Sequence, residues 1–164
     1  MKPQKNFVID FDSTFTKVEA FDVLAEISLK DHPEKESIQK QIFEITNRGM
    51  DGSLSLRESI EKRIQLLAPE KKHLAQLVTH LKTLVSDSFN RNKEFFTTHS
   101  ANIFIISNGF REFIEPVVTS FGVKKENIFA NDFIFDDKPS KAIVAGRPSW
   151  CWKNRGCKYF GSAP

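Results

Sequence analysis

The sequence has 164 residues and a mass of 18.8 kDa, which is enough for one domain and a modest insertion. Hydrophobic residues make up 40% and charged residues 27%, a composition that excludes collagen-like, coiled-coil and wholly disordered proteins. No apolar run approaches the roughly eighteen residues that a bilayer span needs, and the first ten residues lack the apolar core of a signal peptide. We therefore expect a cytoplasmic protein with no membrane partner.

The formal net charge of +3 is distributed unevenly along the chain. Residues 1–137 hold 18 basic and 21 acidic residues, a net charge of −3, whereas residues 138–164 hold six basic residues and no acidic one. Both Trp, both Cys and the single Tyr also lie in this basic tail. Two interpretations stay open: the tail binds an acidic partner or nucleic acid, or it is unrelated to the preceding domain through an altered reading frame or a sequence junction. Its composition favours the second.

The predicted elements begin with a β-rich apolar run at residues 5–10, which is typical of a buried parallel strand. About eighty residues of helical character follow. Four helices are predicted there from apolar spacing, a capping box and a first-turn proline: residues 18–30, residues 38–45 with a break at 47–52, a helix opened by Ser55 and Glu58, and a helix with Pro69 in its first turn.

The pattern changes in the second half of the chain. Residues 101–106 form a second β-rich run that ends in Ser-Asn-Gly, and residues 110–121 predict an amphipathic helix stopped by Gly122. Residues 127–130 predict a third strand, and residues 133–135 an arm of a hairpin.

This order of elements predicts an α/β fold with an open parallel sheet and a small helical cap inserted after the first strand. We expect the α/β core at residues 1–16 and 86–137, the cap at 17–85, and the basic tail at 138–164.

Two acids directly follow the first strand. Asp10 and Asp12 are two residues apart on an extended segment and are followed by Ser13 and Thr14. Carboxylates at this spacing point to the same side, and their repulsion favours either a hard cation such as Mg²⁺ or a split of their pKa values. The alternative, a pair of solvated acids or a helix cap, explains one Asp but not the second.

Residues 7–14, Phe-Val-Ile-Asp-Phe-Asp-Ser-Thr, resemble the DxDx[ST] first motif of the haloacid dehalogenase (HAD) superfamily, and the longer pattern with Glu19 resembles phosphoserine phosphatases. Residues 105–110 resemble the second motif of that family, a strand that ends in Ser or Thr. Residues 50–63 resemble the substrate-reading part of its helical cap. The resemblance covers about residues 5–137 and implies a HAD-like, Rossmann-like sheet that is incomplete.

The resemblance also implies roles for individual residues. Asp10 would be the nucleophile that takes the phosphoryl group, and Asp12 would protonate the leaving oxygen and then activate water. Mg²⁺ would be held by a carboxylate oxygen of Asp10 and the backbone carbonyl of Asp12. Ser107, Asn108 and Gly109 would hold the phosphate oxygens.

For the amino-acid end of O-phospho-L-serine, the resemblance implies that Arg63 binds the carboxylate and Glu19 the ammonium group, with Met50 beside them. Each residue also has a purely structural alternative. Arg63 would be one more charge on a solvated helix face, Glu19 an acid favoured near a helix N-terminus, and Met50 a packing residue beside a helix end. The implied activity is the last step of serine biosynthesis. The Phe residues fit a buried core and not a surface for stacking nucleic-acid bases, so no nucleic acid partner is expected. The sequence leaves open whether the chain forms a homodimer.

The sequence departs from the family pattern in three places. Leu56 stands where Phe is more frequent, and Asn108 stands where Gly is usual. The family's later catalytic Lys and GDGxND-like loop have no counterpart, since no acid follows Asp137. This predicts a C-terminally truncated or altered form with weakened Mg²⁺ binding, which keeps two alternatives open. One is a HAD phosphatase or phosphotransferase for another small phosphomonoester, and the other is a catalytically silent phosphate-binding module.

Overall fold

The computed structural model describes residues 5–135 and 142–145. The rest of the predicted basic tail lies outside these residues. Four strands form one sheet in the order β1-β2-β3-β4: β1 Phe7–Ile9, β2 Ile103–Phe110, β3 Ile128–Phe135 and β4 Ala142–Ala145. The first three strands are parallel, so the predicted open parallel sheet is confirmed. The segments predicted separately at 127–130 and 133–135 form one continuous strand, and its second half pairs antiparallel with β4.

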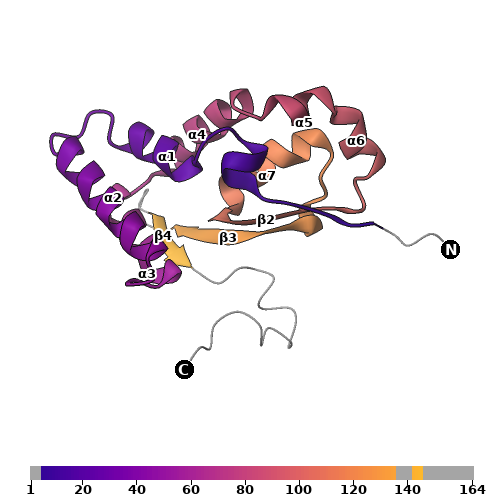
Figure 1. The fold of residues 1–164 in the computed structure, drawn as a ribbon. Coiled ribbons are helices and arrows are strands. Elements are labelled where there is room, and N and C mark those ends of the chain that lie inside the picture. Colours follow the sequence, from indigo (N-terminus) through magenta and orange to yellow (C-terminus); the bar gives the residue numbers. More distant parts are fainter. Residues whose placement is uncertain (1–4, 136–141, 146–164) are drawn as a thin grey trace.

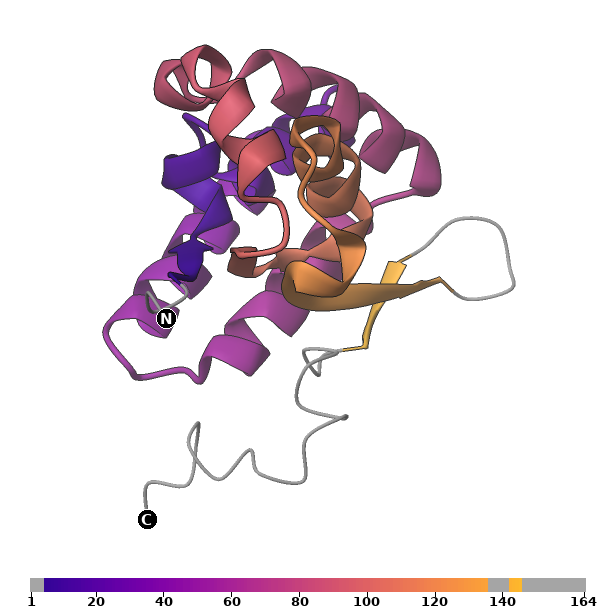
Figure 2. The same cartoon turned by 90° about the vertical axis from the view of Figure 1, so that its right-hand side faces the viewer.

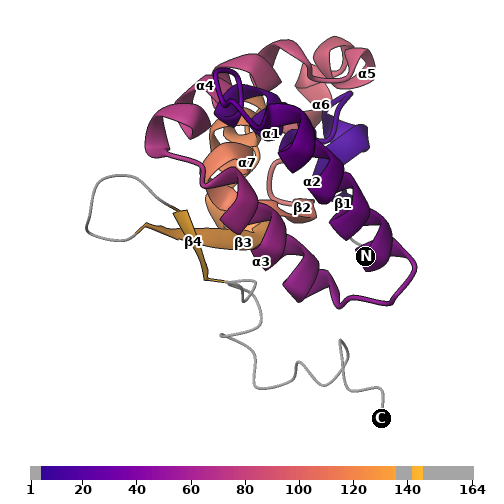
Figure 3. The same cartoon turned by 90° about the vertical axis from the view of Figure 1, so that its left-hand side faces the viewer.

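The helices between β1 and β2 are α1 Ala20–Ser28, α2 Lys35–Met50, α3 Leu56–Leu67, α4 Lys71–Thr83, α5 Asp87–Arg91 and α6 Lys93–Thr98. After β2 follow α7 Arg111–Val118 and the 3₁₀ turns Thr119–Phe121 and Lys125–Asn127. Figures 1 and 2 show α4 to α7 on one face of the sheet, and Figures 1 and 3 show α2 and α3 as a helical hairpin beyond its end, with α3 next to β4.

The two faces of the sheet differ in burial. Ile103 and Ile105 of β2 are fully buried on the helix-covered face, whereas Ile106 is 46% exposed and Val8 of β1 is 63% exposed. Strands of parallel sheets are usually covered on both faces, and their apolar sequences reflect this. Within the described part of the chain only one face has that cover, and β1 lies at the edge of the sheet.

Phenylalanine fills much of the core, as its frequency in the sequence predicts. The ring of Phe15 lies 4.9 Å from that of Phe89, 5.1 Å from that of Phe121 and 5.8 Å from that of Phe96, measured between centroids. Full burial of one such side chain contributes about 1.5–3 kcal/mol to folding, so this cluster is a major source of stability.

Three predicted boundaries are corrected by the structure. The second helix does not break at Asn47 but continues to Met50, because Gly49 allows α2 to approach α3 closely: a Cβ there would lie 2.8 Å from the hydroxyl of Ser59. The second strand does not end at Ile106 but resumes after an irregularity and pairs Phe110 with Asn131.

The third correction concerns the start of α4. Pro69 precedes the helix instead of lying in its first turn, and Glu70 is the N-cap. His73 closes this cap, since its Nδ1 atom accepts a hydrogen bond from the backbone N–H of Glu70 at 3.1 Å.

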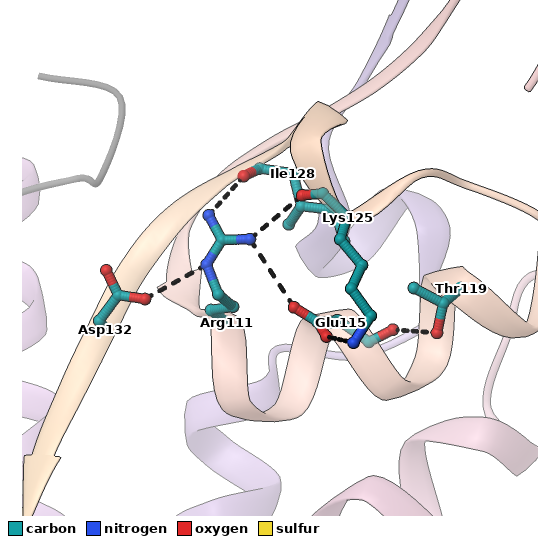
Figure 4. Close-up of polar contacts among 6 residues, drawn as sticks. All are labelled: Arg111, Glu115, Thr119, Lys125, Ile128 and Asp132. Atoms are coloured by element: carbon teal, nitrogen blue, oxygen red, sulfur yellow. Dashed lines mark hydrogen bonds and ion pairs between the residues drawn. The ribbon is translucent and has the colours of Figure 1, made fainter. Parts of the chain in front are cut away.

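A cluster of polar contacts around Arg111 ties α7 to β3 (Figure 4). Its Nε atom donates to Asp132 at 3.2 Å, and its Nη2 atom donates to the carbonyl of Ile128 at 2.6 Å. Its Nη1 atom donates to the carbonyl of Lys125 at 3.3 Å and lies 3.8 Å from Glu115. These contacts fix the start of α7, which directly follows the end of β2.

The segments that lead into and out of α1–α4 are joined to each other. Thr16 and Val85 form an isolated antiparallel bridge. The Ser86 hydroxyl donates to the carbonyl of Thr14 at 2.7 Å, and its N–H donates to the carbonyl of Phe15 at 2.9 Å. We call Thr16, Val85 and Ser86 the linker clamp. Whether the predicted cap at 17–85 is a separate unit stays a prediction.

Among the described residues, no helix combines the length and the apolar character that a membrane crossing requires.

Candidate active site

The site begins where β1 ends, in a tight turn that presents polar side chains. The turn spans Phe11–Phe15, and both of these phenylalanines are fully buried, so they anchor its two ends in the core. Between them, Ser13 and Thr14 are exposed, whereas Asp12 is half-buried. Asp10, just before the turn, is exposed and accepts a hydrogen bond from the N–H of Phe11 at 2.7 Å.

Asp12 lies between two segments that are distant in sequence. Its Oδ1 atom accepts a hydrogen bond from the N–H of Ala20 at 2.8 Å, in the first turn of α1, and its Oδ2 atom lies 3.4 Å from the hydroxyl of Ser107. Burial raises the pKa of Asp12 to about 6, and the negative charges of Glu19 and Asp10 act in the same direction. This carboxyl group therefore holds a proton closer to neutral pH than a solvated Asp does.

The irregular end of β2 supplies the second group of polar atoms. The hydroxyl of Ser107 accepts a hydrogen bond from the N–H of Gly109 at 2.9 Å, and the side-chain amide of Asn131 donates to the carbonyl of Asn108 at 2.7 Å. A Cβ at Gly109 would lie 3.1 Å from the hydroxyl of Ser107 and 3.1 Å from Ile114, closer than ordinary contact. Glycine at this position thus keeps the serine hydroxyl in place.

Glu19 is the N-cap residue of α1 and is linked to the turn after β1. The hydroxyl of Ser13 donates to its Oε1 atom at 2.5 Å. Ser13 has a φ of +52°, in the left-handed region that residues other than Gly, Asn and Asp seldom adopt. The hydrogen bond between Ser13 and Glu19 holds the Glu19 carboxylate next to the acids of the turn.

Arg63 reaches the same region from α3. It is half-buried, its Nε atom donates to the carbonyl of Ser59 at 3.3 Å, and its guanidinium carbon lies 4.7 Å from the centroid of the Phe21 ring. Burial lowers the pKa of Arg63, while the nearby charges of Asp22, Glu19 and Asp12 oppose that shift. The guanidinium group is therefore within electrostatic range of the acids that follow β1.

The structure does not bring every expected residue to this place. Met50 is the last residue of α2 and is 83% exposed. Leu56, which stands where the family pattern has Phe, is also exposed, at the start of α3. No packing of Met50 against the other candidate residues supports its assignment, which stays a prediction.

The oxygen atoms at the turn suit a hard cation. Mg²⁺ in proteins is typically bound by one or two carboxylates, with waters and substrate phosphate completing six ligands. The exposed carboxylate of Asp10 and the carbonyl of Asp12 match that small set of ligands. In the part of the chain that the structure describes, no three His, Cys, Asp or Glu residues cluster as a metal site.

Sequence reasoning missed three contributors to the site. Phe21 lies in the helix predicted at residues 18–30 from apolar spacing, and its ring contacts Arg63. The hydroxyl of Ser13 pairs with Glu19, and the amide of Asn131 donates to the carbonyl of Asn108, neither of which the motifs indicate. The contact of Phe21 with Arg63 has a sequence signal, an aromatic residue two positions after Glu19. The bonds of Ser13 and Asn131 depend on backbone geometry that sequence spacing does not reveal.

Comparisons with known proteins find similar sequences. The chain is 29% identical over 126 residues to the chloroplastic phosphoserine phosphatase of Arabidopsis thaliana, a match that covers 77% of this chain and 40% of that protein. It is 27% identical over 130 residues to phosphoserine phosphatase of Homo sapiens, covering 77% of this chain and 52% of the human protein. No protein-family model matches the chain.

Solved structures show the same likeness. A phosphoserine phosphohydrolase-like protein from Francisella tularensis superposes with a TM-score of 0.72 at 30% identity, over 86% of this chain and 64% of that one. A phospho-aspartyl intermediate analogue of phosphoserine phosphatase superposes with a TM-score of 0.65 at 20% identity, over 87% and 64% of the two chains. The chain thus has the HAD-type fold and is phosphoserine phosphatase-like in sequence, and it spans about half the length of the curated relatives it matches.

Proposed function

We propose that this chain is built for phosphoserine phosphatase chemistry, the hydrolysis of O-phospho-L-serine to L-serine and phosphate. The observation that carries the proposal is the position of Asp12, whose carboxylate connects the exit of β1, the start of α1 and the hydroxyl of Ser107 at the end of β2. In open α/β sheets, ligands bind outside the carboxyl ends of the strands, and these groups surround that place. The similarity to phosphoserine phosphatases supports the choice of substrate.

In this reaction Asp10 acts as the nucleophile. An oxygen of its exposed carboxylate forms a bond to phosphorus while the bond from phosphorus to the serine oxygen breaks. Asp12 donates its proton to that leaving oxygen, which yields neutral serine hydroxyl and an aspartyl phosphate on Asp10. Asp12 then accepts a proton from water, whose oxygen attacks phosphorus and releases phosphate together with the restored Asp10 carboxylate.

The remaining groups hold the substrate. The hydroxyl of Ser107 and the backbone around Asn108 and Gly109 bind phosphate oxygens, and Arg63 binds the carboxylate end through parallel N–H bonds. Glu19 accepts from the ammonium group. Asp10 and the carbonyl of Asp12 would hold Mg²⁺, which when bound neutralises charge on the phosphate.

The cellular setting is part of the same proposal. Hydrolysis of phosphoserine would place the chain at the last step of serine biosynthesis in the cytoplasm. Its partner is then a small phosphomonoester and not a nucleic acid or a membrane, and a homodimer is compatible with the proposal.

One observation favours a second candidate, a catalytically silent phosphate-binding module. The later acidic loop that completes the metal site in the family this sequence resembles has no counterpart, since no acid follows Asp137. In that case Ser107, Arg63 and Glu19 would bind a phosphate ester without turnover.

Release of phosphate from O-phospho-L-serine in the presence of Mg²⁺ tests the proposal. The wild-type chain should release phosphate, and Asp10→Asn should abolish release without unfolding the protein, since Asn can still accept the N–H of Phe11. Asp31→Asn, an exposed acid after α1, is the matched control and should keep wild-type activity. Equal rates for wild type and Asp10→Asn would refute the enzymatic function, and calorimetric binding of phosphoserine would then support the silent module.

A further inference from the structure

The guanidinium group of Arg63 is held at two points. Within its own helix, Nε donates to the carbonyl of Ser59, one turn earlier, at 3.3 Å. From α1, the ring of Phe21 lies 4.7 Å from the guanidinium carbon, well within the distance of about 6 Å at which a cation is attracted to an aromatic face. The two Nη groups make no hydrogen bond or ion pair with any of the described residues, so they remain available to a ligand.

Phe21 also contacts the end of β2. Its ring packs edge-to-face against Phe110, with centroids 5.7 Å apart and an interplanar angle of 68°. Phe110 is fully buried, stacks on Phe133 at 3.8 Å and directly follows Gly109 in the chain. One half-buried side chain thus contacts both the arginine of α3 and the strand end that carries the Ser107 hydroxyl.

We propose that Phe21 is a positioning residue, whose ring orients the guanidinium group of Arg63 so that this chain prefers phosphate esters bearing a carboxylate. The inference rests on the proposed function, since it deepens the way in which the same site selects its substrate. The ring fixes the plane of the guanidinium, and a fixed plane presents both Nη groups to a carboxylate with less loss of side-chain freedom than a mobile arginine. Phe21 itself touches no reacting atom.

A role in packing alone makes a different prediction. If Phe21 served only to fill space against Phe110, an aliphatic residue of similar size would disturb binding of every phosphate ester equally. If it orients Arg63, the effect is confined to ligands that carry a carboxylate.

The test measures affinity by calorimetry in the full chain for two ligands, O-phospho-L-serine and O-phosphoethanolamine, which lacks the carboxylate. Phe21→Leu should weaken binding of phosphoserine by about 3- to 30-fold, the range expected for loss of a cation–aromatic contact, and leave phosphoethanolamine within about 2-fold. Phe21→Tyr, which keeps the ring, should restore the affinity for phosphoserine. Phe89→Leu, which removes a half-buried ring that stacks on Phe15 far from Arg63 in sequence, is the matched control and should not change the preference.

Two results would overturn the inference: equal weakening of both ligands by Phe21→Leu, or a wild-type chain that does not prefer phosphoserine. Turnover of phosphoserine by wild type is measured in parallel. A chain that binds phosphoserine selectively but releases no phosphate would refute the proposed hydrolysis, and the role of Phe21 would still be decided by the affinities.

Discussion

The hydroxyl of Ser107 lies 3.4 Å from the Oδ2 atom of Asp12, although 95 positions separate these residues in the chain. The parallel pairing of β1 with β2 produces this proximity, because it brings the carboxyl ends of both strands to the same edge of the sheet. Any chemistry at this edge therefore uses groups from both strands.

Replacing Ser107 by Ala should reduce kcat/KM for phosphoserine by about 100-fold, the size of effect seen when one donor to a developing oxyanion is removed. The variant loses a hydroxyl that would contact phosphate and that also accepts the N–H of Gly109. Phosphate release measured over a range of substrate concentrations checks this. Ser107→Thr keeps the hydroxyl and should retain most of the activity, and a Thr variant as poor as the Ala variant would contradict a role for the hydroxyl.

Gly109→Ala should impair phosphate release more than it impairs folding. The added methyl group would lie 3.1 Å from the Ser107 hydroxyl and 3.2 Å from the ring of Phe113, so that one of these groups must shift by a few tenths of an ångström. Activity and urea unfolding, measured on the same preparation, separate the two effects. Unchanged activity would show that the serine hydroxyl does not need its observed position.

Glu112→Gln should raise the unfolding free energy above that of wild type, and this gain should grow as the pH rises. Burial raises the pKa of Glu112 above its ordinary value of 4.5, and the Oε2 atom has no hydrogen-bond partner among the described residues. The unfolded chain then loses this proton at lower pH than the folded chain does, so that wild-type stability falls as the pH rises from about 4.5 through the folded pKa. The Gln side chain can still accept the N–H of Phe133.

Urea unfolding at pH 4.5 and pH 7 measures this difference. The gain in unfolding free energy of Glu112→Gln over wild type should be larger at pH 7 than at pH 4.5. Glu126→Gln, at an exposed position, is the control and should show no such change. A gain that does not depend on pH would show that the carboxyl group of Glu112 is not the cause.

Ser55→Ala should lower the unfolding free energy by about 1 kcal/mol, the usual cost of losing an N-cap side chain. Ser55 accepts from the N–H of Glu58 at 3.2 Å, and its own N–H donates to the Glu58 carboxylate at 3.1 Å, so both halves of the predicted capping box are present. Chemical denaturation measures the loss. Ser88→Ala on α5, where the side chain caps no helix, should change stability by less than about 0.5 kcal/mol.

Arg111→Lys should lower the unfolding free energy by about 1–3 kcal/mol, because a lysine amine cannot replace the fork of donors that reaches β3 and the turn before it. The carbonyl of Ile128 and the carboxylate of Asp132 both lose a partner in this variant. Arg91→Lys, at an exposed position in α5, is the matched control and should be close to neutral. Equal stability of the two variants would mean that the contacts in Figure 4 contribute little.

Much of the fold follows from the sequence because its signals are local. The apolar run before Asp10 and the capping box at Ser55 each depend on a few neighbouring residues, and both elements form where they are predicted. The break expected at Asn47 was wrong because packing against α3 outweighs the weak helix propensity of Asn and Gly.

The candidate site was predictable in part. The spacing of Asp10 and Asp12 placed them together, and the resemblance to the family pointed to Ser107 and Arg63. The contact of Phe21 with Arg63 and the bond from Asn131 to the carbonyl of Asn108 join separate elements, and they become visible only when the chain is folded. The placement of Met50 is not supported by any contact of this kind.

The linker clamp has a consequence for the turn after β1. Ser86 binds the carbonyls of Thr14 and Phe15, so the loop that carries Asp12 takes its position from a residue that meets neither metal nor ester. Exchanging the side chain at position 86 removes only the contact with Thr14, because the bond to Phe15 comes from the backbone N–H. An engineer who wishes to retune such a centre would start there.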